Sequence, residues 1–281
     1  MRIGMLMVRH PRSKVSPIMP EVVELLTGWG AEVETICPDD ELTRLSDLRV
    51  EHDVYVLKSG SELALSLAGA LHQAGATIVN PYPVAAACRD KVIATSVLQS
   101  AGVPTPETYL AAHVSELAPV LDEGPLVVKP YRGTNGVGVH TVWDPDQLDD
   151  VAQGGVIFAQ RYHKPEGRDR KIYVVGGQVF GVKRVWPART YEEKLGEPFI
   201  ITRELREIAL ACGRAFGIEL YGLHIIMSEG RPYVVDISSF PGFKGVPDAS
   251  LRLADYIYAA AERALRGEPA VSAAAEPEVV R

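Results

Sequence analysis

Cysteines, long hydrophobic runs and an excess of positive charge are scarce or absent in this sequence, and each absence excludes a class of protein. The 281 residues include three cysteines, Cys37, Cys88 and Cys212, which are odd in number and widely spaced. This spacing fits neither a disulfide framework nor a zinc site, so we expect packing residues. No apolar run reaches the roughly 18 residues of a membrane span, and residues 1–8 are too short for a signal-peptide core. The sequence therefore predicts a globular protein of the cytoplasm.

Positive charge is concentrated in places although the formal net charge is −7, a balance that argues against a nucleic-acid surface. Basic residues gather in three groups: Arg9, His10, Arg12 and Lys14; Arg168, Arg170 and Lys171; and Lys183 and Arg184. Ordinary solvated surface charge is one interpretation of such groups. The other is a site for a small anionic molecule. We predict an acceptor of that kind as the partner, with no nucleic acid and no membrane, and with the oligomeric state left open.

The most informative stretch that is present is residues 127–139, VVKPYRGTNGVGV. Its start predicts a strand that ends at Lys129, and Gly133, Gly136 and Gly138 allow backbone N–H groups to approach an anion. Thr134 and Asn135 lie within the loop. The dinucleotide fingerprint does not fit, because a second strand pattern follows instead of a helix. The Walker motif does not fit either, because its Gly-Lys-Ser/Thr is absent. The pattern indicates a flap over the phosphates of ATP, and an ordinary glycine-rich hairpin is the alternative.

The first 85 residues alternate between strand and helix patterns. Strands are predicted over residues 2–8, 32–36, 54–57 and 77–79, and helices over residues 20–28 and 61–74. This alternation predicts a parallel, doubly wound α/β domain over residues 1–85. Ligands of such sheets bind at the carboxyl ends of the strands. Arg9, His10 and Lys58 follow predicted strands directly and are expected to face one crevice.

The rest of the chain divides into two further domains and a tail. Residues 86–158 are expected to form a central lid domain with the flap, a helix over residues 85–100 at its start and another near residues 146–152. Residues 159–266 combine strands over 171–175, 178–182, 223–226 and 233–236 with helices over 203–216 and 250–266. Residues 267–281 are rich in alanine, glutamate, proline and valine and are expected to be a flexible tail.

The order of the motifs resembles the ATP-grasp superfamily, over residues 1–266. The residues that carry the resemblance are Arg89-Asp-Lys91, Lys129, the glycine-rich flap, Ala159-Gln-Arg-Tyr162, Asp169-Arg-Lys171 and the segment 236–245, DISSFPGFKG. The resemblance implies an ATP-grasp fold, α/β and α+β, in which two lobes hold ATP between them.

Two branches of the superfamily share the detailed likeness. Gly133-Thr-Asn135, Lys171 with the following IYVVG, and FPGFKGV after residue 239 resemble the inositol 1,3,4-trisphosphate 5/6-kinases, as does Lys58 after its apolar strand. Arg89-Asp-Lys91, Glu166-Gly-Arg-Asp169 and Lys183-Arg184 are similar to the RimK-type carboxylate–amine ligases. In that second branch position 171 would be expected to carry arginine, so the motifs alone leave the acceptor open.

The nucleotide-binding residues are assigned by combining the resemblance with electrostatics. Lys91 and Lys129 would neutralise the α- and β-phosphates of ATP. Gln160, Arg161 and Tyr162 would form the hinge beside the adenine, an assignment that comes from the resemblance alone. Lys171, Lys183 and Arg184 lie on a predicted hairpin and would stabilise the phosphoryl group during transfer. The alternatives are an exposed helix lysine at position 91, a plain crossover strand at 160–162 and exposed strand charges on the hairpin.

The metal site departs from the superfamily pattern. Asp236 ends an apolar strand and is the central candidate for Mg²⁺, with Ser238 and His224 beside it. Members of the superfamily carry an acid where this chain has His224 and an asparagine where it has Ser238. Because imidazole is a poor ligand for Mg²⁺, a preference for Mn²⁺ is one expectation and a purely structural His224 is the other.

Three functions are consistent with these residues. The main hypothesis is a kinase that transfers the γ-phosphate of ATP to a hydroxyl of a small anionic polyol. The residues expected to hold that acceptor are Arg9, Arg12, Lys14, Lys58, Gly242 and Lys244. The alternative is a ligase that makes an acyl phosphate from a carboxylate and joins it to an amine. The third is a nucleotide-binding protein with little catalytic activity.

Overall fold

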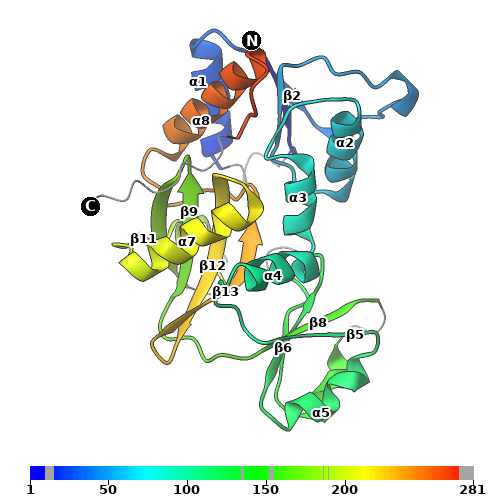
Figure 1. Ribbon diagram of the computed structural model, residues 1–281, viewed down its shortest axis with the longest axis vertical. Helices are drawn as coiled ribbons and strands as arrows, with labels where there is room; N and C mark the ends of the chain where they lie inside the picture. Colours follow the sequence, from blue (N-terminus) through cyan, green and yellow to red (C-terminus); the bar gives the residue numbers. More distant parts are fainter. Residues whose placement is uncertain (10–15, 134–135, 152–154, 186, 189, 272–281) are drawn as a thin grey trace.

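The computed structural model describes residues 1–9, 16–133, 136–151, 155–185, 187–188 and 190–271. Within these ranges the chain forms three sheets (Figure 1). A parallel sheet with its helices stands at the top of the view, a longer antiparallel sheet at the centre, and a small four-stranded sheet at the bottom. His10, Arg12, Lys14, Thr134 and Asn135 lie outside the described residues.

The N-terminal sheet is parallel. Its strands are β1 (Arg2–Leu6), β2 (Glu32–Ile36), β3 (Val54–Leu57) and β4 (Ile78–Val79), in the order β2-β1-β3-β4. Helices α1 (Ile18–Gly28) and α2 (Glu62–Gln73) and two 3₁₀ turns (Pro38–Asp40 and Leu45–Asp47) connect them. All of β3 is buried, as expected for a parallel strand covered by helices. The prediction of a parallel α/β domain is confirmed.

The helix predicted over residues 85–100 is two helices, α3 (Tyr82–Arg89) and α4 (Lys91–Ser100). They meet at Asp90, whose backbone is extended and whose side chain accepts hydrogen bonds from the N–H groups of Val92 and Ile93. Asp90 is therefore the N-cap of α4. The prediction of one helix is wrong because hydrophobic periodicity does not reveal an acid that ends one helix and begins the next.

The small sheet at the bottom of Figure 1, which we call the lid, carries the glycine-rich flap. Its strands are β5 (Thr108–Ala111), β6 (Leu126–Pro130), β7 (His140–Val142) and β8 (Ile157–Arg161), in the order β5-β8-β6-β7. A 3₁₀ turn (Val114–Leu117), α5 (Ala118–Leu121) and a 3₁₀ helix (Pro145–Asp150) pack beside them, the last in place of the helix predicted near 146–152. The boundary expected between residues 158 and 159 falls inside β8.

The central sheet is antiparallel and has two different faces. Its strands are β9 (Asp169–Val175), β10 (Gln178–Arg184), β11 (Glu197–Pro198), β12 (Leu220–Ser228) and β13 (Arg231–Ser238), in the order β11-β10-β9-β12-β13. Helix α7 (Arg203–Phe216) packs on one face, where Ile172, Val174 and Leu223 share a core with Leu205 and Cys212. A short helix, α6 (Tyr191–Leu195), precedes β11.

The other face of the central sheet joins the N-terminal domain. Tyr173 and Val175 belong to the same buried cluster as Ile3 of β1 and Leu253 of α8 (Ala249–Leu265). Helix α8 lies beside α1 (Figure 1) and also contacts the central sheet, where Arg252 lies 4.8 Å from the ring of Phe180. Ala270, within the predicted flexible tail, is buried, and its carbonyl accepts a hydrogen bond from Arg263. The N-terminal and central sheets therefore share one core.

A buried asparagine fastens the two sheets to each other. Asn80 follows β4 and is 1% exposed. Its side-chain amide donates hydrogen bonds to the carbonyl of Leu220 at 2.6 Å and to that of Ser239. Both carbonyls belong to the central sheet or the loop that leaves it, so this one side chain fixes the position of the segment after β13.

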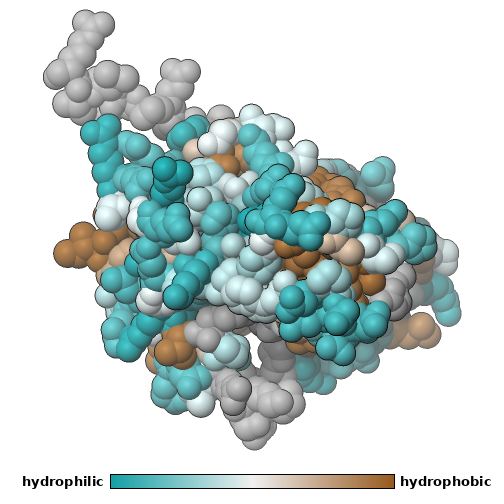
Figure 2. Space-filling model, turned by 90° about the horizontal axis from the view of Figure 1, so that it is seen from below, coloured by the Kyte–Doolittle hydropathy of each residue, from teal (hydrophilic) through white to brown (hydrophobic). Residues whose placement is uncertain are grey.

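The lid end of the surface is mainly hydrophilic. Figure 2, viewed from below, shows hydrophobic residues in separate patches among hydrophilic ones. None of the helices in the described ranges is long and apolar enough to cross a bilayer. Cys37, Cys88 and Cys212 are free and buried, which confirms them as packing residues.

Replacement of Asn80 by alanine should destabilise the folded protein by about 2 kcal/mol, because two buried carbonyls lose their donor. Urea unfolding followed by far-UV circular dichroism measures the difference. The matched control is Gln99→Ala, at an exposed amide on α4, which should stay within about 0.5 kcal/mol of the wild type. Equal stabilities of the two variants would show that Asn80 does not join the sheets.

Candidate active site

Lys129 lies near the end of β6, between the lid and the central sheet. Its ammonium group donates to Oε1 of Gln160 at 2.7 Å and to the carbonyl of Val235 at 3.3 Å. Burial lowers the pKa of Lys129 to about 8, Asp236 opposes the shift and Lys91 adds to it. A buried amine near a carboxylate at the base of a glycine-rich flap is suited to binding phosphate.

Lys91 connects the flap with the central sheet. Its backbone N–H donates to the carbonyl of Tyr131 at 2.9 Å, and its ammonium group donates to the carbonyl of Gly133 at 2.9 Å. The same ammonium group lies 3.8 Å from Oδ1 of Asp236. The side chain is 14% exposed, which excludes the alternative of a freely exposed helix lysine.

Five charged or titratable residues lie on one face of the central sheet. His224 of β12 is opposite both Lys171 of β9 and Asp236 of β13, and Arg184 of β10 is opposite Asp169 of β9. Side chains directly opposite each other on neighbouring strands share a face, as do residues two apart on one strand. We call this set, Asp169, Lys171, Arg184, His224 and Asp236, the charged row. It lies on the face opposite α7.

His224 is paired with an acid of the charged row. Its Nε2 lies 2.7 Å from Oδ2 of Asp169, and both side chains are largely buried. Burial lowers the pKa of His224 to about 4, Lys171 lowers it further and Asp169 opposes the shift. This geometry supports the structural interpretation of His224. Asp169 is absent from the predicted site, although its spacing of two residues from Lys171 in a strand is a signal for it.

Asp236 and Ser238 are the remaining metal candidates. They are two residues apart on β13 and so share a face. Among the described residues, no group of three or more histidines, cysteines and acids could hold a metal ion. One carboxylate and one hydroxyl fit a Mg²⁺ ion that takes most of its ligands from nucleotide phosphates and water. Because Nε2 of His224 faces Asp169, Nδ1 is the ring nitrogen that remains for a metal ion, and the role of His224 as a ligand favouring Mn²⁺ stays a prediction.

The predicted hinge residues have separate contacts. The side chain of Gln160 is buried and binds Lys129 and Thr108. Arg161 faces the lid, where it binds the carbonyl of Gly124 at 2.6 Å and Glu123 at 3.0 Å. The ring of Tyr162 lies 5.2 Å from that of Trp143. The side chain of Arg161 therefore supports the lid, whereas that of Gln160 orients Lys129.

Lys183 and Arg184 point to opposite faces of β10. Arg184 belongs to the charged row, and its Nε is buried without a hydrogen-bond partner. Lys183 is opposite Arg170, and its ammonium group lies 5.3 Å from the ring of Phe199, which packs on the α7 side. The structure therefore does not bring Lys183 to the predicted catalytic group, because neighbouring residues of a strand alternate between faces.

The residues predicted to hold the acceptor are partly brought together. Lys58 donates to the carbonyl of Phe240 at 3.3 Å, in the segment that also contains Gly242 and Lys244. Arg9 is mostly exposed and pairs with Asp40 at 3.3 Å, so it lies outside this group. Arg12 and Lys14, in the same predicted clamp, lie outside the described residues.

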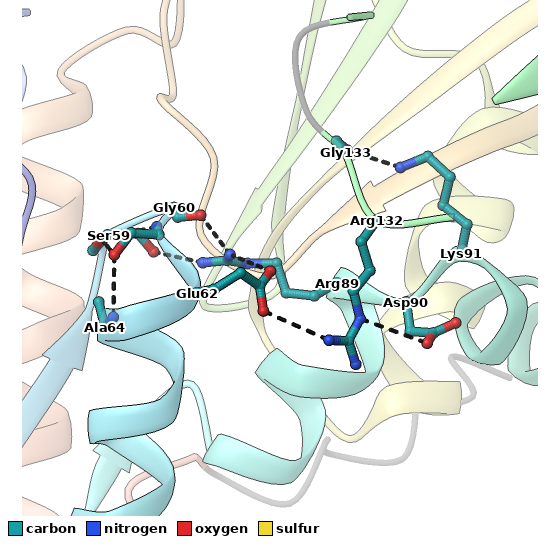
Figure 3. A network of polar contacts seen from close by, with 10 residues as sticks. Ser59, Gly60, Glu62, Ala64, Arg89, Asp90, Lys91, Arg132 and Gly133 are labelled. Atoms are coloured by element: carbon teal, nitrogen blue, oxygen red, sulfur yellow. Dashed lines mark hydrogen bonds and ion pairs between the residues drawn. The ribbon is translucent and has the colours of Figure 1, made fainter. Parts of the chain in front are cut away.

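The flap begins at a network that joins three parts of the chain (Figure 3). Arg132 lies 3.6 Å from Glu62 of α2 and 3.8 Å from Asp90. Gly136 and Gly138 have φ values of 73° and 71°, which other residues adopt only with strain. Thr134 and Asn135, also predicted to bind the nucleotide, lie outside the described residues. The first residues of the flap are therefore fixed to Lys91 and to α2.

Comparisons with known proteins agree with this geometry. A family model of the RimK-like ATP-grasp domain matches residues 88–260. The chain is 28% identical to a probable α-L-glutamate ligase of Methanococcoides burtonii, over 70% of this chain and 72% of that protein. It is 30% identical to a ribosomal protein bS6–L-glutamate ligase of Escherichia fergusonii, over 69% and 71%. A RimK domain ATP-grasp structure from Sphaerobacter thermophilus has a TM-score of 0.72 at 17% identity, covering 92% of this chain and all of that one, and confirms the fold.

ATP binding should weaken as the pH rises above the pKa of Lys129, which is about 8 in the free protein. A neighbouring phosphate raises that pKa, so binding above this pH must take up a proton. Affinity should then fall by up to about tenfold per pH unit. Calorimetric titration in buffers of different ionisation enthalpy measures both affinity and proton uptake.

Two lysine variants provide the controls for this titration. Lys129→Met should bind ATP weakly and with less proton uptake than the wild type, whereas Lys164→Met, at an exposed lysine, should behave like the wild type. Lys171, whose pKa is also about 8, accounts for the uptake that remains. Proton uptake in Lys129→Met equal to that of the wild type would contradict the assignment.

Replacement of His224 by aspartate should destabilise the protein, because the new carboxylate would face the buried Asp169. Losing the donor that faces a buried carboxylate and adding a like charge beside it costs about 3 kcal/mol. His224→Asn keeps a donor near Asp169 and should lose less. Urea unfolding of both variants measures the difference. If the aspartate variant is as stable as the wild type, the contact between His224 and Asp169 is not structural.

Proposed function

The chain belongs to the RimK-like ATP-grasp family, and from this premise we propose that it joins a carboxylate to an amine while ATP is converted to ADP and phosphate. The observation that carries the proposal is the charged row: Lys171 and Asp236 share one face of the sheet, and Lys91 and Lys129 adjoin Asp236 beneath the flap. These positions suit a phosphoryl group transferred between a bound nucleotide and an acid.

The main hypothesis from the sequence, a kinase acting on a polyol hydroxyl, is wrong. The relatives that match over about 70% of the chain are named as ligases of glutamate. The kinase-like features were Gly133-Thr-Asn135, Lys171 with the residues after it, Lys58 and the segment after β13. They indicate an anionic acceptor and a held phosphoryl group, and they do not identify the atom that is phosphorylated. An alcohol and a carboxylate both attack through oxygen, so the phosphate-binding residues do not distinguish the two.

Each residue has a defined task in the proposed reaction. Lys91 and Lys129 bind the phosphates of ATP. A carboxylate oxygen of the substrate attacks the γ-phosphorus, the bond to ADP breaks, and Lys171 stabilises the charge on the phosphoryl oxygens. The amine then attacks the acyl carbon, and phosphate leaves. Asp236 and Ser238 would hold Mg²⁺ against the nucleotide, where the ion neutralises phosphate charge. The partner that is joined to the first substrate is a small molecule or a protein, and one relative is named as a ligase of ribosomal protein bS6 and L-glutamate.

The test measures ADP formation and product mass with panels of carboxylic acids and amines. ADP formation should require both substrates, and the product should be an amide. Lys171→Met should lower kcat by about 100-fold or more while the ATP-induced rise in Tm is retained. Lys164→Met is the control at an exposed lysine. A stable phosphate ester as product, or ATP binding without turnover for any pair, would overturn the proposal.

A further inference from the structure

Some cations near the charged row already have hydrogen-bond or ion-pair partners within the protein, and others do not have an acid as partner among the described residues. The guanidinium group of Arg89 donates to the carbonyls of Gly60 and Ser59, both at 2.6 Å, and lies 4.0 Å from Glu62 (Figure 3). Arg132 contacts Glu62 and Asp90. Both arginines are occupied by internal contacts. Their effect is to fix the loop that follows β3.

That loop presents Lys58 at the carboxyl end of β3, the side of a parallel sheet where ligands bind. The backbone N–H groups of Lys58 and Ser59 both donate to the carbonyl of Leu6, at 3.0 and 2.7 Å. The ammonium group of Lys58 donates to the carbonyl of Phe240 and lies 5.2 Å from its ring. Burial lowers the pKa of Lys58 to about 8, and the neighbouring cations Lys244 and Arg89 lower it further.

Lys244 extends the same group of cations toward the charged row. Its ammonium group lies 5.1 Å from the ring of Tyr191. Burial lowers its pKa, and Lys194 and Arg184 add to the shift. Burial lowers the pKa of Lys171, and Arg184 in turn lowers it further. Gly245, next to Lys244, packs against Val182 of β10, two residues before Arg184, and Arg184 and Lys171 share the face of the charged row. We call Lys58, Lys244, Arg184 and Lys171 the cationic strip.

Among the described residues, the lowered pKa values of Lys58 and Lys244 come from burial and from neighbouring cations, which are Lys244 and Arg89 for Lys58, and Lys194 and Arg184 for Lys244. The nearby acids Glu62 and Asp90 are paired with Arg89 and Arg132, and Asp169 and Asp236 lie at the inner end, beside His224 and Lys91. Positive charges that lie close together at partly buried positions, as Lys58 and Lys244 do, destabilise the free protein. Their arrangement is explained if an anion from outside binds there.

We propose that Lys58 and Lys244 form an anion subsite for a second acidic group of the carboxylate substrate, so that the acid used by this protein is a dianion. The proposal rests on the ligase function above. The reacting carboxylate lies at the inner end of the strip, beside Lys171, and the second group, a carboxylate or a phosphate, lies at the outer end. Arg89 is a positioning residue that holds the loop carrying Lys58.

The test is binding without turnover. Glutarate, 3-phosphonopropionate and butyrate are titrated into the full chain at constant ionic strength without ATP, and calorimetry and the rise in Tm report affinity. The wild type should bind at least one of the two dianions more tightly than butyrate, and the tighter dianion identifies the second group. Lys58→Gln and Lys244→Gln should weaken dianion binding by about tenfold or more. Lys58→Arg should retain it, and Lys164→Gln should match the wild type.

The free protein gives an independent measurement. At low ionic strength Lys58→Gln should raise the Tm, because it removes a repulsive charge, whereas loss of a purely structural lysine would lower it. The subsite is disproved if butyrate binds as tightly as both dianions, if Lys58→Gln keeps wild-type affinity, or if Lys164→Gln loses as much. These outcomes are separate from the ligase test: amide formation from a monocarboxylate with no dianion binding would disprove the subsite and leave the ligase function standing.

Discussion

The fixed register of β9, β12 and β13 is the constraint on which the site depends. This pairing places Lys171, His224 and Asp236 opposite one another across three strands. Because side chains alternate between faces along a strand, a shift of one residue in any of these pairings would turn that strand's charged residues toward the core under α7. The hydrophobic residues of the α7 face, such as Ile172 and Leu223, resist this shift, since it would expose them.

The shared core between the N-terminal and central sheets gives the site its second property, which is burial of amines. Lys58, Lys129 and Lys171 each have a pKa lowered to about 8, with desolvation as the largest cause. Such amines are charged at neutral pH but carry an energetic penalty that a bound anion relieves. The protein is acidic overall, so this concentration of cations is local. Nucleotide phosphate beside Lys129 and acidic groups of the substrate beside Lys171 and Lys58 would restore the charge balance.

The pairing of His224 with Asp169 shows how a departure from a superfamily pattern can be compensated inside the protein. An acid at position 224 would be repelled by Asp169, whereas an imidazole can donate a hydrogen bond to it. The exchange removes one expected carboxylate from the metal site. Under the proposed function, Asp236 would act with the nucleotide to hold a Mg²⁺ ion that takes most of its ligands from phosphates and water.

The sequence by itself determined the local features: the parallel N-terminal domain, the strand pairs of the central sheet, the flap between β6 and β7, and the lysines at 91, 129 and 171. Hydrophobic periodicity and glycine placement encode these features within a few neighbouring residues. The position of Lys183 on the α7 face, the lid contacts of Arg161 and the partner of His224 were decided by the tertiary structure. Each depends on which strand or helix packs alongside, and residues far apart in the chain supply that neighbour. The same reason explains Lys58 and Lys244: 186 positions separate them in the sequence, and only the fold makes them neighbours.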